Sequence, residues 1–266
     1  MNLTLQIPLH DESLTPYLEA VRGDGWDGIE LPGEVMQDES GWEDAIEAFG
    51  VPCRGLGDLL PDAVGRYLPE TAAAARERLL TYMKRLMTRA AMLNIEYAVI
   101  QLGVDRIASG ALDAELTARC KLLRSLMALA ETHEITVCVP VSLPAPAYRR
   151  DLLARTVRLI QEVMHPKCRL ALDLRPDELP ADFEPADFLR THGPSIAVLR
   201  FHYEPALGLG FTADSQAEWA DAVRREHYQG DIVFCPHITG VDAIRRQSRA
   251  VAPRLRSTWR GLPDED

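Results

Sequence analysis

Residues 97–141 read YAVIQLGVDRIASGALDAELTARCKLLRSLMALAETHEITVCVPV, and this stretch decides the fold. It opens with a β-rich run over 97–102 and closes with a second run over 135–141. Between the runs, apolar residues recur at intervals of four, three, four and three, which places them on one face of a helix (Leu116, Cys120, Leu123, Met127 and Ala130). A strand, an amphipathic helix and a further strand predict a βαβ unit with two parallel strands.

The same alternation extends along the chain on both sides of that unit. A helical stretch is predicted over 70–93, and another carries Leu153, Val157, Ile160 and Met164 on one face. Eight β-rich runs alternate with such stretches, over 3–9, 28–31, 51–56, 97–102, 135–141, 169–174, 196–202 and 231–235. This order predicts an α/β fold, the parallel eight-stranded (β/α)₈ TIM barrel, and the 266 residues suit a single domain over 1–266.

Composition and charge exclude several classes of protein. A formal net charge of -11 repels a phosphate backbone, so we expect no nucleic-acid partner. No stretch approaches the roughly 18 uninterrupted apolar residues of a membrane helix, so we expect no membrane association. The opening Met1-Asn2-Leu3-Thr4 does not resemble a secretory signal, and the five cysteines are an odd and widely spaced set. We therefore expect a cytoplasmic protein with reduced thiols.

Polar residues follow several of the predicted strands, and in a parallel barrel the active site lies where the strands end. Side chains alternate between the two faces of a strand, so Arg200 shares a face with His202, and Asp173 shares one with Arg175. If Asp173 and His202 point into the barrel, Arg200 points inward too. The candidate residues at strand ends are His10, Asp11, Glu30, Asp58, Gln101, Asp173, Arg175, His202, Glu204, Cys235 and His237.

In their order and spacing, several of these segments resemble the xylose-isomerase-like family of sugar isomerases, epimerases and related endonucleases. Residues 25–31, GWDGIEL, are similar to the family's second strand, in which an aromatic residue follows Gly and a Glu ends the strand. The resemblance spans nearly the whole chain and implies a sugar-like substrate. Its other segments are 90–103 for the fourth strand, 133–141 for the fifth, 170–173 for the sixth, 198–204 for the seventh and 228–235 for the eighth.

The resemblance also implies a metal site, and this sequence carries only half of it. Many enzymes of the family hold one divalent metal with Glu, Asp, His and Glu from strands five to eight, and the two glutamates also act as acid and base. Asp173 and His202 match two of these ligands, whereas the glutamates fall on Pro140 and Cys235. We therefore expect no cofactor, with a divalent metal as the less favoured alternative.

Two arrangements could balance the charge of Asp173. In the one we prefer, Arg200 replaces the cation and binds Asp173 in a bidentate pair. In the other, Asp173, His202, Cys235 and His237 hold a divalent ion, and that ligand set suits zinc better than magnesium or manganese.

The expected function is isomerisation or epimerisation of a small sugar-like molecule by proton transfer. Glu30, Asp173, His202 and Glu204 would supply acid and base. Gln101, Arg175, Arg200 and His237 would contact the substrate, with Arg175 suited to a phosphate or carboxylate group.

The alternative is a non-catalytic barrel that binds a sugar-like ligand or a partner protein, and the absence of both family glutamates favours it. Whether the protein is an enzyme is left open at this point. A homodimer, formed through the long loops and the helix predicted over 70–93, is also left open. A DNA-repair endonuclease is disfavoured by the negative charge and the incomplete metal cluster.

Overall fold

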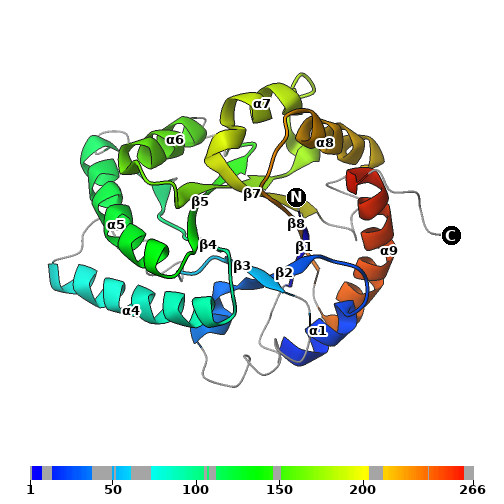
Figure 1. The fold of residues 1–266 in the computed structure, drawn as a ribbon. Helices are drawn as coiled ribbons and strands as arrows, with labels where there is room; N and C mark the ends of the chain where they lie inside the picture. The colour runs from blue at the N-terminus through cyan, green and yellow to red at the C-terminus, as the bar shows by residue number, and fades with distance from the viewer. Residues whose placement is uncertain are drawn as a thin grey trace.

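The computed structural model describes residues 2–7, 14–37, 50, 52–60, 73–104, 107, 112–145, 151–203, 212–238 and 240–260. Its strands close into a barrel in sequence order, each parallel to both neighbours, which confirms the predicted (β/α)₈ barrel (Figure 1). The strands are β1 (Leu3–Gln6), β2 (Gly28–Pro32), β3 (Cys53–Gly57), β4 (Tyr97–Val99), β5 (Thr136–Leu143), β6 (Cys168–Leu174), β7 (Ile196–Tyr203) and β8 (Asp231–Pro236).

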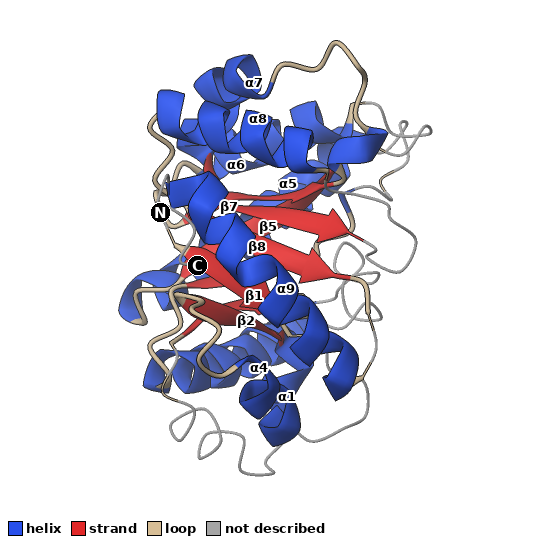
Figure 2. Ribbon diagram, turned by 90° about the vertical axis from the view of Figure 1, so that its right-hand side faces the viewer, coloured by secondary structure: helices blue, strands red, loops and turns tan. Residues whose placement is uncertain are grey.

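Helices surround this barrel, and the strand arrowheads all point toward one end of it (Figure 2). The α-helices are α1 (Leu14–Val21), α4 (Ala73–Met92), α5 (Leu112–Thr132), α6 (Leu152–Val163), α7 (Pro185–His192), α8 (Ala213–Arg225) and α9 (Val241–Arg260). Short 3₁₀ turns are η1 (Gly33–Gln37), η6 (Pro176–Glu178) and η7 (Gly193–Ser195). No helix in the described part of the chain is long and apolar enough to cross a membrane.

Every predicted β-rich run overlaps one strand, and the differences lie at the ends. β4 stops at Val99, so Gln101 lies in the loop beyond it rather than on the strand. β5 continues through Pro140, which pairs with Ala171 of β6, and reaches Leu143. The predicted helix over 70–93 corresponds to α4, whose described part begins at Ala73.

The strands separate two hydrophobic layers. One face of each strand packs against the helices in the larger core, where Leu170, Leu172 and Phe201 are fully buried. The other face fills the barrel interior with Tyr97, Val99, Cys138, Ala171, Val198, Val233 and Cys235. Side chains two residues beyond these on β6, β7 and β8 therefore also point inward, toward the C-terminal end of the barrel.

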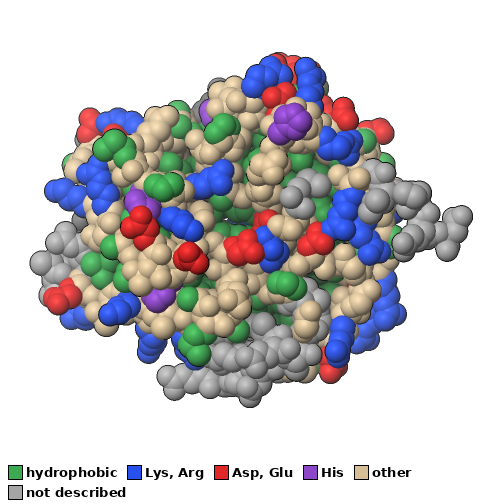
Figure 3. All heavy atoms as spheres, in the orientation of Figure 1, with side chains coloured by type: hydrophobic (Ala, Val, Ile, Leu, Met, Phe, Trp, Pro, Cys, Tyr) green, Lys and Arg blue, Asp and Glu red, His purple; other side chains and the backbone are tan. Residues whose placement is uncertain are grey.

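The opposite end of the barrel, where the strands begin, is closed by paired charges. Arg54 donates through Nε to Asp231 Oδ2 at 2.9 Å, and Asn2 Nδ2 donates to Asp231 Oδ1 at 2.8 Å. Arg54 also pairs with Glu96 at 2.5 Å. Figure 3 views this end and shows acidic and basic side chains gathered at its centre. Because these charges are paired with one another and lie at the N-terminal ends of the strands, we assign them to stability.

Candidate functional site

Strand register brings the inward-facing polar residues of β6, β7 and β8 together. Asp173 on β6 lies opposite Arg200 on β7, and His202 on β7 lies opposite Cys235 on β8. Neighbours in a parallel pair share a face of the sheet, so the predicted placement of Arg200 on the same face as Asp173 and His202 is confirmed.

Arg200 joins two carboxylates inside the barrel. Its side chain is 3% exposed, with Nη1 at 3.0 Å from Asp173 Oδ1 and Nη2 at 3.1 Å from Glu30 Oε1. The ion pair with Asp173 is present, but the bidentate geometry predicted for it is wrong. Glu30 on β2 is fully buried and needs a counter-charge as well, so the guanidinium is shared between the two acids.

Glu30 is enclosed by protein groups on both carboxylate oxygens. Oε1 accepts from Gln6 Nε2 at 2.9 Å and Oε2 accepts from Tyr97 Oη at 2.9 Å. Burial raises the pKa of Glu30 above its usual value, although Arg200 and the Tyr97 hydroxyl act in the opposite direction. A carboxyl held in this way is suited to orienting Arg200 rather than to meeting a substrate.

Gly57 of β3 provides the space for this ion pair. A Cβ at Gly57 would lie 3.0 Å from Glu30 Oε1 and 3.2 Å from Arg200 Nη2. Those distances are shorter than ordinary van der Waals contacts, so a larger residue would displace the pair. A small residue on β3 is therefore a condition for burying the two charges beside each other.

Asp173, His202 and His237 form a hydrogen-bonded chain that leads from the barrel interior to the surface. Asp173 Oδ1 lies 2.9 Å from His202 Nε2, and His202 Nδ1 lies 3.0 Å from His237 Nε2. The Asp173 and His202 side chains are 15% and 17% exposed, whereas His237 is exposed. Both ring nitrogens of His202 are thus engaged, one on each side.

Asp173 is kept in its charged form at this position. Burial alone would raise its pKa, but the Arg200 guanidinium and the hydrogen bond from His202 outweigh burial and hold the pKa below its usual range. The charge of Arg175 acts in the same direction. Glu30 and Asp173 therefore have pKa values displaced in opposite directions on the two sides of one arginine.

The remaining predicted residues are more dispersed. Gln101 Nε2 donates to Asp58 Oδ1 at 3.4 Å in the loops after β4 and β3. Arg175 has a 56% exposed side chain whose Nη1 lies 3.7 Å from Glu178 Oε1. His10, Asp11 and Glu204 lie outside the described residues. Among the candidates, the contacts described here join Glu30, Asp173, Arg200, His202 and His237 into one cluster.

Sequence reasoning missed three contributors to this cluster: Gln6, Gly57 and Tyr97. Gln6 offers a signal, since it is a polar residue between Leu5 and Ile7 at the end of an apolar strand. Tyr97 begins its strand and looks like an ordinary core aromatic. Gly57 has no side chain, so only the tertiary structure shows that it faces Glu30, Arg200 and Gln6.

The donor set does not fit a resident divalent cation. Asp173 Oδ1 already faces Arg200, and the pKa of the Cys235 thiol is raised well above its usual value, chiefly by burial. His237 directs Nε2 at His202 instead of at a shared point with Asp173. Across the described ranges no group of three or more His, Cys, Asp or Glu side chains is arranged to hold a metal ion. The predicted zinc set of Asp173, His202, Cys235 and His237 is therefore not assembled there.

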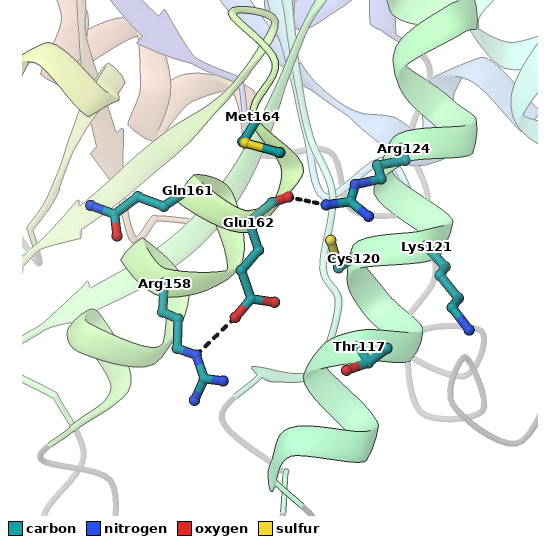
Figure 4. Close-up of a pocket in the computed structure, with 8 residues that line it drawn as sticks. All are labelled: Thr117, Cys120, Lys121, Arg124, Arg158, Gln161, Glu162 and Met164. Atoms are coloured by element: carbon teal, nitrogen blue, oxygen red, sulfur yellow. Dashed lines mark hydrogen bonds and ion pairs between the residues drawn. The ribbon is translucent and has the colours of Figure 1, made fainter.

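A groove of about 410 Å³ lies elsewhere, between α5 and α6 on the outside of the barrel (Figure 4). Arg158 Nε pairs with Glu162 Oε1 at 2.8 Å, and Arg124 donates to the main-chain oxygen of Glu162. Burial raises the pKa of Cys120, which lies on the α5 side of the groove. Since several of its polar groups bond to one another and it lies away from the strand ends, we assign no catalytic role to this groove.

Comparison with solved structures shows which barrels share this fold. The D-psicose 3-epimerase of Clostridium cellulolyticum H10, solved with D-tagatose, superposes with a TM-score of 0.76 and 15% identity over 97% of this chain and 99% of that one. The 3-keto-D-glucoside 4-epimerase of E. coli superposes with a TM-score of 0.71 and 17% identity, over 95% of this chain and 98% of that one. The IolI protein, solved with a bound zinc atom, superposes with a TM-score of 0.64 and 15% identity, over 97% of this chain and 99% of that one.

No protein-family model matches the sequence, and no curated protein sequence matches it either. At these identities the likeness establishes the fold. The chain folds as a TIM barrel and superposes on the two epimerases and on the IolI protein.

Proposed function

We propose that this protein isomerises or epimerises a small sugar-like molecule by proton transfer, at a site that works without a resident metal. The observation that carries the proposal is the chain of Asp173, His202 and His237 at the C-terminal end of the barrel. Titratable groups linked by hydrogen bonds at that end are suited to acid and base work. Sugar epimerases with the same fold support a carbohydrate substrate.

The proposed division of labour follows from burial and contacts. Arg200 compensates the buried charges of Glu30 and Asp173, and Asp173 in turn orients His202. The two imidazoles hold or release the proton. Glu30 pairs with Arg200 deeper inside the barrel. Of the predicted acid–base residues that the structure describes, Glu30 is the one most completely enclosed.

The proposed substrate contacts are Gln101, Arg175 and His237. Arg175 directly follows β6, two residues beyond Asp173, and carries an exposed permanent charge, so it suits a phosphate or carboxylate group on the sugar. Glu204 follows β7 directly in sequence and stays a prediction for the second acid or base.

The donor set supports a reaction without a metal requirement. A cation beside Asp173 would lie against the Arg200 guanidinium, and neither Pro140 nor the protonated thiol of Cys235 replaces a carboxylate ligand. The proposed reaction therefore depends on the protein's own acids, bases and charges.

The test is hydrogen exchange on sugars. The protein is incubated in D₂O with D-psicose, D-fructose, D-tagatose and L-ribulose, with and without EDTA, and NMR follows epimer formation and loss of carbon-bound hydrogen. We expect turnover that survives EDTA and is lost in His202→Ala. Elemental mass spectrometry of the purified protein accompanies the assay, and a stoichiometric metal that is lost in His202→Ala would contradict a metal-free site.

A non-catalytic barrel that binds a sugar-like ligand or a partner protein is the second candidate. It is favoured by the enclosure of Glu30 and Arg200, which bond to each other and to Tyr97 and Asp173 inside the barrel. Calorimetric binding of one of the same sugars without exchange or epimer formation would support it over the enzyme. Sedimentation can test whether the protein forms a homodimer, and cell fractionation can test the expected cytoplasmic location.

A further inference from the structure

We propose that Asp58 and Gln101 form a subsite that binds neighbouring hydroxyl groups of the substrate at the barrel mouth, the end at which the strands finish. These two residues are called the hydroxyl subsite below. The proposal rests on the proposed function for the identity of the ligand, since it names the part of a sugar-like molecule that the subsite takes. Asp58 is then a further specificity-determining residue of that site.

Asp58 follows β3 in a backbone conformation that few residues adopt. Its φ is 48°, in the left-handed region, where Asp is one of the few residues other than Gly found often. Gly57 faces Glu30 and Arg200 in the interior, so an extended Asp58 would point outward, toward the helices. The left-handed turn interrupts that alternation. Burial is the chief cause of the raised pKa of Glu30, and the charge of Asp58 acts in the same direction. The exposed carboxylate of Asp58 therefore acts on the barrel interior from its mouth.

The main chain around Asp58 is held from two sides. A Cβ at Gly33, after β2, would lie 2.4 Å from Leu59 Cα and 2.7 Å from Asp58 O, so only Gly lets the two loops approach this closely. On the other side, Leu59 N–H donates to Val99 O of β4 at 2.8 Å. An uncommon backbone conformation persists where its surroundings determine it, and such residues cluster at functional sites.

Gln101 is anchored in the loop after β4 in the same manner. The residue before it, Ile100, donates its N–H to Cys138 O at 2.8 Å. The residue after it, Leu102, accepts from Arg119 Nε through its carbonyl at 2.7 Å. Gln101 thus has a fixed backbone and a half-buried side chain. Little further ordering is needed when a ligand binds, which lowers the cost of binding.

The chemistry of the two side chains suits hydroxyl groups. Gln101 Nε2 donates to Asp58 Oδ1 at 3.4 Å, longer than a typical hydrogen bond. A carboxylate accepts several hydrogen bonds, and the amide of Gln101 keeps its oxygen as an acceptor. Arg200 bonds Glu30 and Asp173 through its Nη atoms instead of Asp58. Neighbouring sugar hydroxyls can donate to the two acceptors, whereas a phosphate is repelled by the carboxylate. The subsite therefore selects the neutral, polyhydroxy part of a ligand.

The place of the subsite in the barrel orients the ligand. β3 and β7 are four strands apart in either direction around the closed barrel, so they face each other across the interior. Arg200 of β7 reaches that far, since a Cβ at Gly57 of β3 would lie 3.2 Å from its Nη2. A ligand in the mouth then lies between Asp58 on one side and Asp173 and His202 on the other. Binding of its hydroxyl groups at Asp58 directs the rest of the molecule toward that cluster.

A polyol tests the subsite separately from the reaction. Ribitol has neighbouring hydroxyls and no carbonyl, so proton transfer beside a carbonyl cannot act on it. Ribitol, D-psicose, D-fructose, D-tagatose and L-ribulose are each titrated into ¹⁵N-labelled protein, and NMR follows the backbone amide signals of residues 99–103. We expect these signals to shift, and the dissociation constant to rise roughly tenfold in Asp58→Asn. Asn retains the left-handed conformation and loses the charge.

The matched control is Glu134→Gln. Glu134 is also an exposed carboxylate at a left-handed φ, 57°, but it precedes β5 at the opposite end of the barrel. This variant should bind as the parent does. Gln101→Leu is the second test variant and should also weaken binding. Thermal unfolding checks that each variant is folded, and if Asp58→Asn is not, Gln101→Leu decides.

The outcomes separate the subsite from the proposed function. If the folded test variants bind as tightly as the parent, the subsite is wrong, while turnover in the sugar exchange assay leaves the proposed function standing. If binding depends on Asp58 and no sugar is turned over, the subsite stands and the proposed function fails. If neither ribitol nor any of the sugars binds the parent, the subsite is overturned.

Discussion

At the scale of single residues, Arg200 separates two carboxylates that would otherwise repel each other inside the barrel. Glu30 is fully buried and Asp173 is 15% exposed, and each is bonded to a different Nη atom of Arg200. Removing one partner of a buried charge group leaves the others uncompensated, which costs far more than losing a surface pair.

Arg200→Leu should therefore lower the free energy of unfolding by about 3–5 kcal/mol, measured by urea denaturation. The matched control is Arg245→Leu, which breaks an exposed ion pair with Asp242 on the same helix, and it should change stability little. An Arg200→Leu protein that unfolds at the same urea concentration as the parent would show that the buried pair does not stabilise the fold.

Gly57→Ala is the complementary change, because it adds volume and removes no charge. The new Cβ would lie 3.0 Å from Glu30 Oε1 and 3.3 Å from Gln6 Nε2, so the buried pair has to shift. We expect a loss of about 1–3 kcal/mol in urea unfolding. Gly193→Ala is the control, since nothing lies within 4 Å of its Cβ and its φ of -48° is helical. Equal stability of the two variants would mean that the pair has more room than its distances indicate.

At the scale of elements, the loop after β4 is fastened to α5 by a buried arginine. Arg119 is 4% exposed and donates through Nε to Leu102 O at 2.7 Å, while Nη1 pairs with Glu115 Oε2 at 2.9 Å. This loop carries Gln101, one of the proposed substrate contacts. A helix of the outer layer thereby determines the position of a residue at the barrel mouth.

Arg119→Leu should cost about 1–3 kcal/mol, because it leaves a buried carbonyl without its donor. Hydrogen exchange should also become faster at Leu102 and Gly103, measured by mass spectrometry. Arg158→Leu on the neighbouring helix is the control, since its pairs with Asp113 and Glu162 are exposed. Unchanged exchange at the loop in Arg119→Leu would rule out this anchoring role.

At the scale of the whole molecule, the two buried acids give stability opposite dependences on pH. The pKa of Glu30 is raised in the fold above its ordinary value of 4.5, so its contribution is complete below that value and is lost as pH rises through the raised pKa. The pKa of Asp173 is lowered from 3.8, so its contribution is present above that value and is lost as pH falls.

Glu30→Gln should consequently flatten the decline of unfolding free energy above pH 4.5, measured by urea denaturation from acid to neutral pH. Gln keeps an oxygen for Tyr97 and cannot ionise. Glu178→Gln, an exposed carboxyl in the turn after β6, is the control and should leave the slope as it is in the parent. If the unfolding free energy of Glu30→Gln declines with pH as steeply as that of the parent, Glu30 ionises in the folded protein at little cost in stability.

The barrel itself could be predicted from the sequence, because its signals are local. Apolar periodicity marks each strand and helix, and alternation of the two allows a parallel closed sheet. The alternation of side chains along β7 predicted that Arg200 and His202 lie on one face of the strand, and the structure confirms it. The order of segments such as 25–31 and 170–173 indicated a resemblance to xylose-isomerase-like barrels, and two sugar epimerases superpose on the chain with the same fold.

What only the tertiary structure decided are the contacts between strands distant in sequence. Arg200 is shared between Glu30 and Asp173, instead of binding one of them twice, because barrel closure brings β2 within reach of β7 across the interior. His202 and His237 meet because Tyr203 O continues the pairing of β7 with β8 beyond the strands. Local periodicity determines which face a side chain occupies, whereas its partner depends on register and closure, which are properties of the whole chain.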